Sequence, residues 1–423
     1  MIRFVLSVLS LPSRRVLELP RRTRTVLALL AAWCLASLVL YVHGAYHHGD
    51  VDLYHRYALA FWAGPHAFRS LPAEYPILSI IPFTLTLLPP LPDYLTVFGL
   101  WTLALLLAGL VVLALQEGPR VAEVCAVSLA LAGFGTLVGR YDLLPAATTV
   151  AALWAARGRR FELAYVLLAA GTLLKLYPAL LVPLVAIEQY RALGRDPLRT
   201  PPPRQVLSGV GLCCALVAAG FVAALVLDSQ AWLGPFTYNT RRPLQVESVP
   251  ATLLWLSGLA GFPVSPNRGF HSYNLVGLLS EPIGLAAQAA TIAGLLWVYW
   301  RRATGTLDLG RGMVACLLVV IVTGRVLSPQ YLIWVLPLIA IVEREHDPWW
   351  LVVCAFTTLI FPFGYGLIVS PPGSTAPPSF PPLLLITIGV RNALLVAATV
   401  RFLVRSRARQ EAEPRELTRS AVG

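Results

Sequence analysis

The sequence predicts an all-α integral membrane protein, a polytopic bundle of about twelve transmembrane helices. Hydrophobic residues make up 57% of the 423 residues and charged residues only 13%, and the mean hydropathy is +0.70. This composition excludes a water-soluble fold, in which about a quarter of the residues are charged. A spanning helix takes about 20 apolar residues, so the chain has room for roughly a dozen. The six cysteines all lie in apolar stretches, and we expect them to be packing residues without disulfides.

The expected elements follow the hydropathy along the chain. Residues 1–24 form a cytoplasmic N-terminal arm, because the apolar run at 4–11 is too short to span. The segment 75–90 contains four prolines, so we expect a broken segment at the outer interface rather than a span. Long spans are expected at 25–42, 94–115, 121–138, 205–227, 282–300, 311–327, 349–369 and 383–403, and shorter ones at 143–156, 162–177, 179–190 and 331–342.

The basic residues indicate which helix ends face the cytoplasm. With twelve spans and both termini inside, 24 of the 33 Lys and Arg residues fall on the inner side and 9 on the outer side. Cytoplasmic loops of membrane proteins carry such an excess, so the net charge of +12 implies no nucleic-acid partner. The expected organisation is a transmembrane domain over 25–403 and a cytoplasmic basic tail over 404–423.

Two outer loops, 43–93 and 228–281, are much longer than a turn, and long ordered loops usually carry function. Within the first loop, Val51–Ala63 places apolar and aromatic residues on one helical face and His55 and Arg56 on the other. That pattern predicts a helix that lies on the membrane surface.

Charged side chains are costly at bilayer depth, and in this topology a set of them converges on the outer boundary. Lys175 in GTLLKLYPALLVPL and Arg325 in GRVLSPQYLIW each lie among apolar residues, so an anion is expected to bind them. Cations at this boundary suit a lipid-linked phosphate, and neighbouring carboxylates suit a general base. The full set is Asp50, Asp52, Glu74, Arg140, Asp142, Lys175, Arg241, Arg242, Glu247, His271 and Arg325.

Histidines near the first loop raise the question of a metal site. His43, His47 and His48 bracket Asp50, but a zinc site needs three or four ligands in a defined geometry. Histidine is also common at membrane interfaces. We therefore expect no metal cofactor.

Several blocks resemble one known family. The run GDVDLYHRYALAFWAG followed by AEYPILSIIPF is similar to the first outer loop of family 87 glycosyltransferases. GTLLKLYPALLVPL, RRPLQVESVPATLLW and GRVLSPQYLIWVLPL resemble the later blocks of that family, in the same order, over residues 50–342. The resemblance implies a C-type glycosyltransferase fold, a polyprenyl-phosphate sugar donor, typically mannose, and an envelope glycolipid or polysaccharide acceptor outside the cytoplasmic membrane. It also implies that no metal ion is needed.

The resemblance assigns roles to individual residues. Asp50 matches the loop aspartate that acts as catalytic base, Asp52 is the rival candidate, and Glu74 is a third possibility. Ser70 and Ile77 depart from the family pattern, which has an Asp and a Pro there, and this leaves the acceptor open. Lys175, Arg241, Arg242 and Arg325 are expected to bind the donor phosphate. Candidates for sugar or acceptor contacts are Tyr54, Glu74, Tyr75, Arg140, Asp142, Gln245, Glu247, His271, Gln330 and Tyr331.

Two other function classes share part of this pattern. A transporter or flippase for a lipid-linked sugar would have the same hydrophobicity and basic lining, but it would also need a polar path across the membrane, and few ionisable groups are expected near the midplane. A non-enzymatic scaffold would not need cations and carboxylates gathered on one side. Arabinofuranose remains open as the donor sugar.

Overall fold

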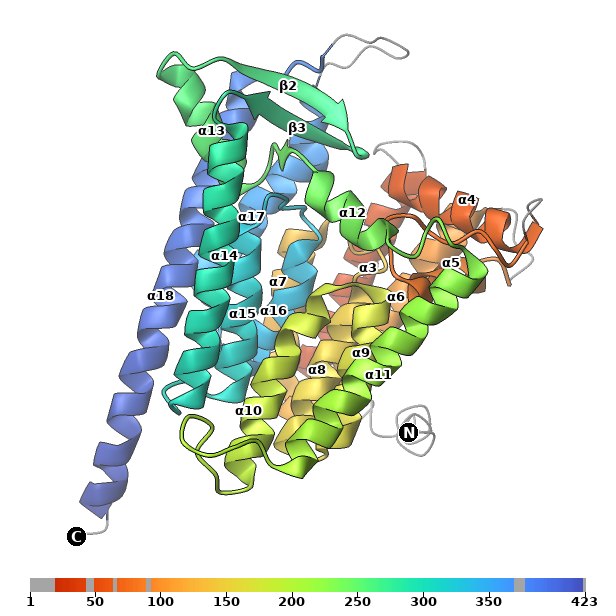
Figure 1. The fold of residues 1–423 in the computed structure, drawn as a ribbon. Coiled ribbons are helices and arrows are strands. Elements are labelled where there is room, and N and C mark those ends of the chain that lie inside the picture. Colours follow the sequence, from red (N-terminus) through yellow and green to blue (C-terminus); the bar gives the residue numbers. More distant parts are fainter. Residues whose placement is uncertain (1–19, 43–48, 64–66, 89–92, 369–376, 421–423) are drawn as a thin grey trace.

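The computed structural model describes residues 20–42, 49–63, 67–88, 93–368 and 377–420. The protein is mostly helical, at 73%, and most of its helices run side by side between two ends of a bundle (Figure 1). One end carries residues 49–63, 67–88 and 228–279, and we call it the loop end. The connection between α10 (Val182–Ala192) and α11 (Arg204–Leu227) lies at the opposite end (Figure 1).

Six described helical segments are long and apolar enough to cross a membrane, as expected for a membrane protein. Only 11% of the apolar window of α11 and of α14 (Ser280–Ala303) is buried inside the protein, whereas 50% of that of α6 (Tyr94–Glu117) is, so the first two pack less closely into the bundle than α6 does. The others are α3 (Arg21–Val42), α18 (Pro382–Ser420) and the helical run of α17 (Pro348–Thr358), η3 (Leu359–Phe363) and η4 (Gly364–Leu367).

Shorter helices complete the bundle at the other predicted positions. None of them reaches the length of about 20 residues that a span requires, so the count of twelve spans stays a prediction. They are α7 (Pro119–Gly133), α8 (Leu143–Arg157), α9 (Phe161–Leu174), α10 with the preceding 3₁₀ turn η2 (Tyr177–Leu181), α15 (Leu309–Thr323) and α16 (Tyr331–Glu343).

Polar residues at the helix ends explain where several helices begin. The side chain of Asp93 accepts hydrogen bonds from the backbone N–H groups of Leu95 and Thr96, both at 3.2 Å, and starts α6. Asp308 caps α15 and Asp347 caps α17 in the same way. Such caps satisfy N–H groups that have no partner in the first turn.

Two helices extend beyond the predicted spans into the terminal segments. α3 begins at Arg21, inside the predicted arm 1–24, and α18 runs through the predicted tail to Ser420. Helix hydrogen bonds are local and Arg and Glu are good helix formers, so a helix continues where the apolar pattern ends. Residues 1–19 lie outside the described part.

The first outer loop contains a helix where the sequence predicts one. It is α4 (Gly49–Ala63), and the proline-containing stretch after it forms only η1 (Ile77–Ser79) and α5 (Ile80–Leu85), too short to span. Tyr54 on α4 is 1% exposed and stacks on Phe83 with 4.3 Å between ring centroids. An aromatic core therefore fixes α4 on the bundle. His43, His47 and His48 lie outside the described residues.

The second outer loop has structure that the sequence did not predict. It contains α12 (Gly234–Arg241), α13 (Val249–Leu259) and an antiparallel sheet of order β1-β3-β2, formed by β1 (Leu244–Gln245), β2 (Val264–Gly269) and β3 (Ser272–Gly277). Phe270 and His271 form the two-residue turn between β2 and β3, with φ values of 55° and 50°. Both positive values fit the primed turns that suit tight hairpins. The turn points this hairpin toward α12 (Figure 1).

The two outer loops are joined directly. The backbone N–H of Leu71 donates to Asp228 Oδ2 at 3.0 Å. Gly234, at the start of α12, lies so close to Ala73 that an added Cβ would be 2.1 Å from its carbonyl oxygen. The loops thus form one layer over the loop end of the bundle.

Candidate functional site

A cavity of about 1250 Å³ lies between this layer and the helices. Its wall is built from both outer loops, from α14, α15, α16, η2, η3 and η4, and from connections at the loop ends of the helices, among them the residues that follow α9. The volume is somewhat above the usual range for small-molecule pockets, about 300–1,000 Å³. The cavity therefore has room for more than one small ligand.

Most of the predicted site residues line this cavity. Tyr54, Asp142 and Arg241 do not: Tyr54 and Asp142 are buried beneath the wall, and Arg241 is exposed on α12. The predicted residues in the wall are Asp50, Asp52, Glu74, Tyr75, Arg140, Lys175, Arg242, Gln245, Glu247, His271, Arg325, Gln330 and Tyr331.

The two aspartates of α4 differ in their contacts. Asp50 forms an ion pair with Arg140, whose Nη1 lies 3.0 Å from Oδ2, and both side chains are largely buried. Asp52 is exposed to the cavity, and within the described residues it has no ion-pair or hydrogen-bond partner. Asp50 is therefore held in one orientation, whereas Asp52 is unrestrained.

Glu74 links the first loop to the β2–β3 hairpin. The hydroxyl of Tyr57 donates to Glu74 Oε2, and His271 Nε2 lies 3.7 Å from Oε1. Burial and this hydrogen bond raise the pKa of the Tyr57 phenol, so the hydroxyl remains a donor. Both Glu74 oxygens are thus engaged, which makes this carboxylate a weaker candidate for a base than Asp50 or Asp52.

The local sequence explains how Lys175 reaches the cavity. Pro178 has no N–H to give to the carbonyl of Leu174, and α9 ends there. Lys175 is the C-terminal cap, in an extended conformation with φ −158° and ψ 135°. Its side chain therefore leaves the helix axis and points into the wall between α8 and α16.

Lys175 is tightly held at that point. Its Nζ lies 2.6 Å from Asp142 Oδ1, and the same oxygen accepts a hydrogen bond of 2.5 Å from Trp334 Nε1. The ammonium also lies over the rings of Tyr141 and Trp334, at 5.2 and 5.1 Å. Trp334 in turn stacks on Tyr177, with ring centroids 4.3 Å apart.

The two cavity arginines have different partners. Arg242 lies over the ring of Tyr238 at 5.2 Å, its buried Nε has no hydrogen-bond partner, and among the described residues no carboxylate pairs with it. Arg325 packs against Gly284 and pairs with the exposed Glu281 at 3.3 Å. Arg242 is therefore an unneutralised cation at the cavity, available for an anion.

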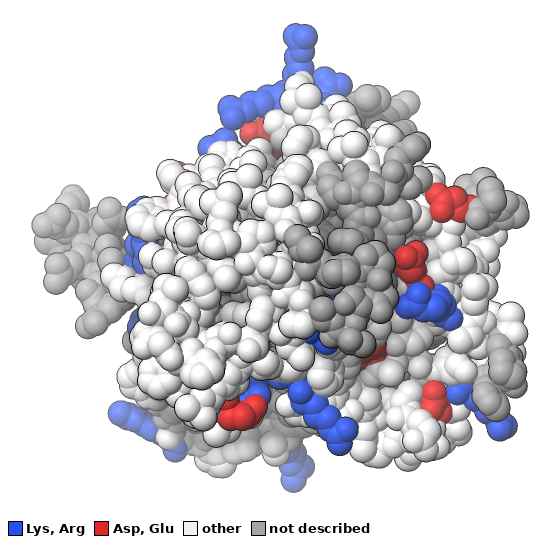
Figure 2. Space-filling model, turned by 90° about the horizontal axis from the view of Figure 1, so that it is seen from above, with Lys and Arg blue, Asp and Glu red and all other residues white. Residues whose placement is uncertain are grey.

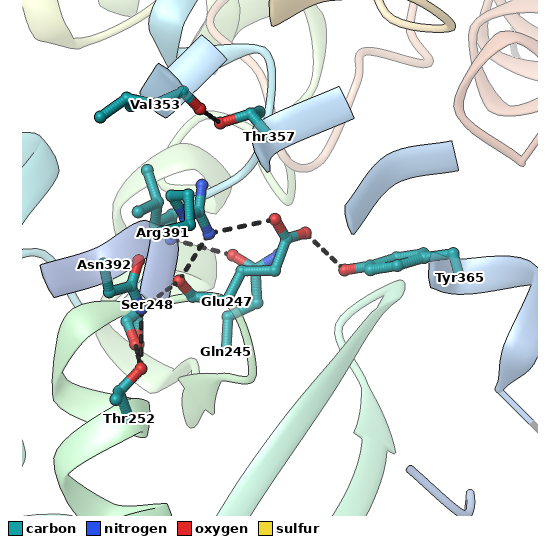
Figure 3. Close-up of polar contacts among 10 residues, drawn as sticks. Gln245, Glu247, Ser248, Thr252, Val353, Thr357, Tyr365, Arg391 and Asn392 are labelled. Carbon is teal, nitrogen blue, oxygen red and sulfur yellow. Dashed lines mark hydrogen bonds and ion pairs between the residues drawn. The ribbon is translucent and has the colours of Figure 1, made fainter. Parts of the chain in front are cut away.

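Gln245 and Glu247 line the cavity but are mainly engaged with protein. Gln245 donates its backbone N–H to the carbonyl of Arg325 and accepts from the N–H of Leu327 with Oε1, both at 3.0 Å. Glu247 is fully buried between Arg391 on α18 and Tyr365 on η4 (Figure 3). Burial raises the pKa of Glu247, although the Arg391 charge opposes this. These contacts connect the second outer loop to the bundle.

Several cavity residues were missed by the sequence reasoning, chiefly aromatic and uncharged ones. Trp334 lies one turn after Tyr331 on α16, and this i, i+3 spacing was the available signal. The others include Tyr238 and Phe270 near the hairpin and Gln288 and Thr291 on α14. On the part of the loop-end surface seen in Figure 2 that is not grey, charged side chains are few and scattered.

Within the described ranges, no group of three or more His, Cys, Asp and Glu side chains is arranged to hold a metal ion. The positive charge at the cavity comes from Arg and Lys side chains.

Comparison with known proteins links the chain to one family. The sequence model described as glycosyltransferase family 87 matches residues 74–329, which include every cationic wall residue named above. The match begins after α4, so Asp50 and Asp52 lie outside it. No curated protein matches the chain.

Proposed function

The chain belongs to glycosyltransferase family 87, and from this membership we propose that it transfers mannose from a polyprenyl-phosphate donor to an envelope glycolipid or polysaccharide on the outer side of the cytoplasmic membrane. Membership makes the protein a membrane glycosyltransferase. The observation that carries the finer proposal is the shared cavity, whose wall contains the α4 carboxylates on one side and Lys175, Arg242 and Arg325 on others.

The proposed reaction is an inverting transfer. Asp50 takes the proton of an acceptor hydroxyl, and the hydroxyl oxygen attacks the anomeric carbon of the donor sugar from the face opposite the phosphate. The bond between that carbon and the phosphate oxygen breaks, and the polyprenyl phosphate leaves with the electron pair. Lys175, Arg242 and Arg325 stabilise the charge that develops on the phosphate. Because these cations are part of the fold, the proposal includes no metal cofactor.

We assign the base role to Asp50 because Arg140 holds its carboxylate in place. A general base must lie within hydrogen-bond reach of the proton that it removes, and a fixed orientation meets this need. Asp52, which faces the same cavity without a partner among the described residues, is the rival. The remaining wall residues, Tyr75, His271, Gln330 and Tyr331, are proposed to contact the sugars, whereas the buried Tyr54 supports α4.

The test is turnover by purified protein with polyprenyl-phosphate mannose, with the arabinofuranose donor in parallel. Asp50→Asn should lower kcat by about 10²- to 10⁴-fold, the usual contribution of a general base, with expression and melting temperature unchanged. Asp52→Asn should have a much smaller effect, and a large loss in that variant alone would move the base to Asp52. Normal turnover in both variants would contradict the mechanism, and transport of an intact lipid-linked sugar without transfer would contradict the function.

A further inference from the structure

Lys175 is the only lysine of the chain, and the other 32 basic residues are arginines. The two side chains are not equivalent, because an ammonium is a compact point charge and a guanidinium is a broad planar fork. Lys175, the one side chain with an ammonium group, is the C-terminal cap of α9 and lies in the wall of the cavity.

The surroundings of Lys175 accommodate a compact cation. Asp142 Oδ1 lies 2.6 Å from its Nζ, and the rings of Tyr141 and Trp334 flank it at 5.2 and 5.1 Å. Trp334 donates its indole N–H to the same oxygen, so the carboxylate is itself oriented. The ammonium is thereby held by one carboxylate and two rings, and its remaining protons are available to the cavity.

Asp142 contacts this ammonium but does not reach the cavity. Its side chain is 0% exposed and is absent from the wall, whereas Lys175 is in the wall and 16% exposed. A sugar or acceptor hydroxyl in the cavity therefore has no access to the Asp142 carboxylate. Any effect of Asp142 on the reaction must pass through the groups that it binds.

We propose that Asp142 is a positioning residue, which fixes the Lys175 ammonium toward the donor phosphate and does not itself contact sugar or acceptor. The proposal rests on the proposed function for the identity of the donor. The position of Lys175 itself can be tested without any substrate.

The single lysine makes that test direct. Lys175 and the α-amino group are the only amines that an acylating reagent can modify, so the labelling rate of Lys175 is read from its own peptide by mass spectrometry on the full-length protein. Asp142→Asn should raise this rate about tenfold, because the ammonium is no longer held by a carboxylate. A matched control is Glu188→Gln, which removes the ion pair with the buried Arg302 instead and should leave Lys175 labelling as in the native protein. An unchanged rate in Asp142→Asn would overturn the proposal.

Added polyprenyl phosphate without a sugar should slow the labelling of Lys175 in the native protein and protect it less in Asp142→Asn. Equal protection in the two proteins would mean that Asp142 does not set the position of the ammonium toward phosphate, and would also overturn the proposal.

Kinetics separate a positioning role from direct contact. Asp142→Asn should raise the KM for the donor about tenfold and leave the KM for the acceptor near its native value. In a Lys175→Met background the same change should add no further loss, because effects that act through one group are not additive. A raised acceptor KM, or an equal loss in both backgrounds, would show that Asp142 acts independently of Lys175. If the native protein transfers no sugar from these donors, the proposed function fails while the labelling result still stands.

If Asp142→Asn alone does not fold, the melting temperature of the double variant Lys175→Met/Asp142→Asn tests the proposal instead. A buried charge left without its partner is strongly destabilising, so Lys175→Met/Asp142→Asn should melt at or above the temperature of Lys175→Met. A lower melting temperature for the double variant would indicate a separate structural role for Asp142 and overturn the proposal.

Discussion

Arg241 and Arg242 are neighbours in the sequence, yet only Arg242 lines the cavity, while Arg241 is exposed at the end of α12. Because Arg242 has no carboxylate partner among the described residues, its charge is available to an anion, which we propose to be the donor phosphate. Arg242→Ala should raise the donor KM by about 10- to 100-fold, as expected when a hydrogen bond between charged groups is removed. The measurement is initial rate against donor concentration at saturating acceptor.

Arg241→Ala is the matched control, because it removes the same side chain one position away. Its donor KM should change far less than that of Arg242→Ala. Equal losses in the two variants would mean that the general positive charge of α12 attracts the donor, and would remove Arg242 from the proposed phosphate site. Measuring the donor KM at raised salt distinguishes a direct contact from general attraction further, since long-range attraction between charges is screened more than a direct contact.

At the scale of elements, the contact between the outer loops depends on Gly234. A Cβ at this position would lie 2.1 Å from the backbone oxygen of Ala73, so Gly234→Ala must push α12 away from the first loop. We expect a loss of about 1–3 kcal/mol in stability, the usual cost of overpacking, and a higher KM for both substrates, because the displaced loops both line the cavity. Melting temperature and steady-state kinetics measure the two effects.

Gly211→Ala on α11 is the control for this change, because an added Cβ there meets nothing within 4 Å. Alanine in a helix interior is favoured over glycine by about 0.5–1 kcal/mol, so this variant should melt at or slightly above the native temperature. If both glycine variants behaved alike, the close approach of α12 to Ala73 would not be what joins the loops.

The elements also show what the sequence could predict. The lengths of the apolar stretches predicted where the helices lie, because a spanning helix must form all its backbone hydrogen bonds within one continuous segment. The β2–β3 hairpin was not predicted, since its turn, Phe270–His271, lacks the usual Asn-Gly or Gly signals. The partner of Lys175 was not predictable either, because Asp142 lies 33 residues from Lys175 and 192 residues from Trp334 in the chain. The predicted topology places these residues at the same membrane boundary. Which of them contact one another depends on how the helices pack, and the sequence does not reveal this.

For the whole molecule, both outer loops and the cavity lie at one end of the bundle, and the connection between α10 and α11 lies at the other (Figure 1). The excess of Lys and Arg in the predicted inner loops predicts that this second end faces the cytoplasm. The proposed acceptor is outside the membrane, so the function depends on this orientation. An inverted protein would present the same cavity to cytoplasmic substrates.

Cysteine labelling in intact cells tests the orientation. In a chain whose six cysteines are replaced by alanine, Asn267→Cys on β2 and Arg195→Cys in the α10–α11 connection place single thiols at exposed positions of the two ends. A membrane-impermeant maleimide should label the thiol at position 267 in intact cells and the thiol at position 195 only after permeabilisation, because the reagent does not cross the bilayer. The cysteine-free parent measures background. Labelling of position 195 alone in intact cells would place the cavity in the cytoplasm, and a lipid-linked donor displayed outside could then not reach Lys175 and Arg242.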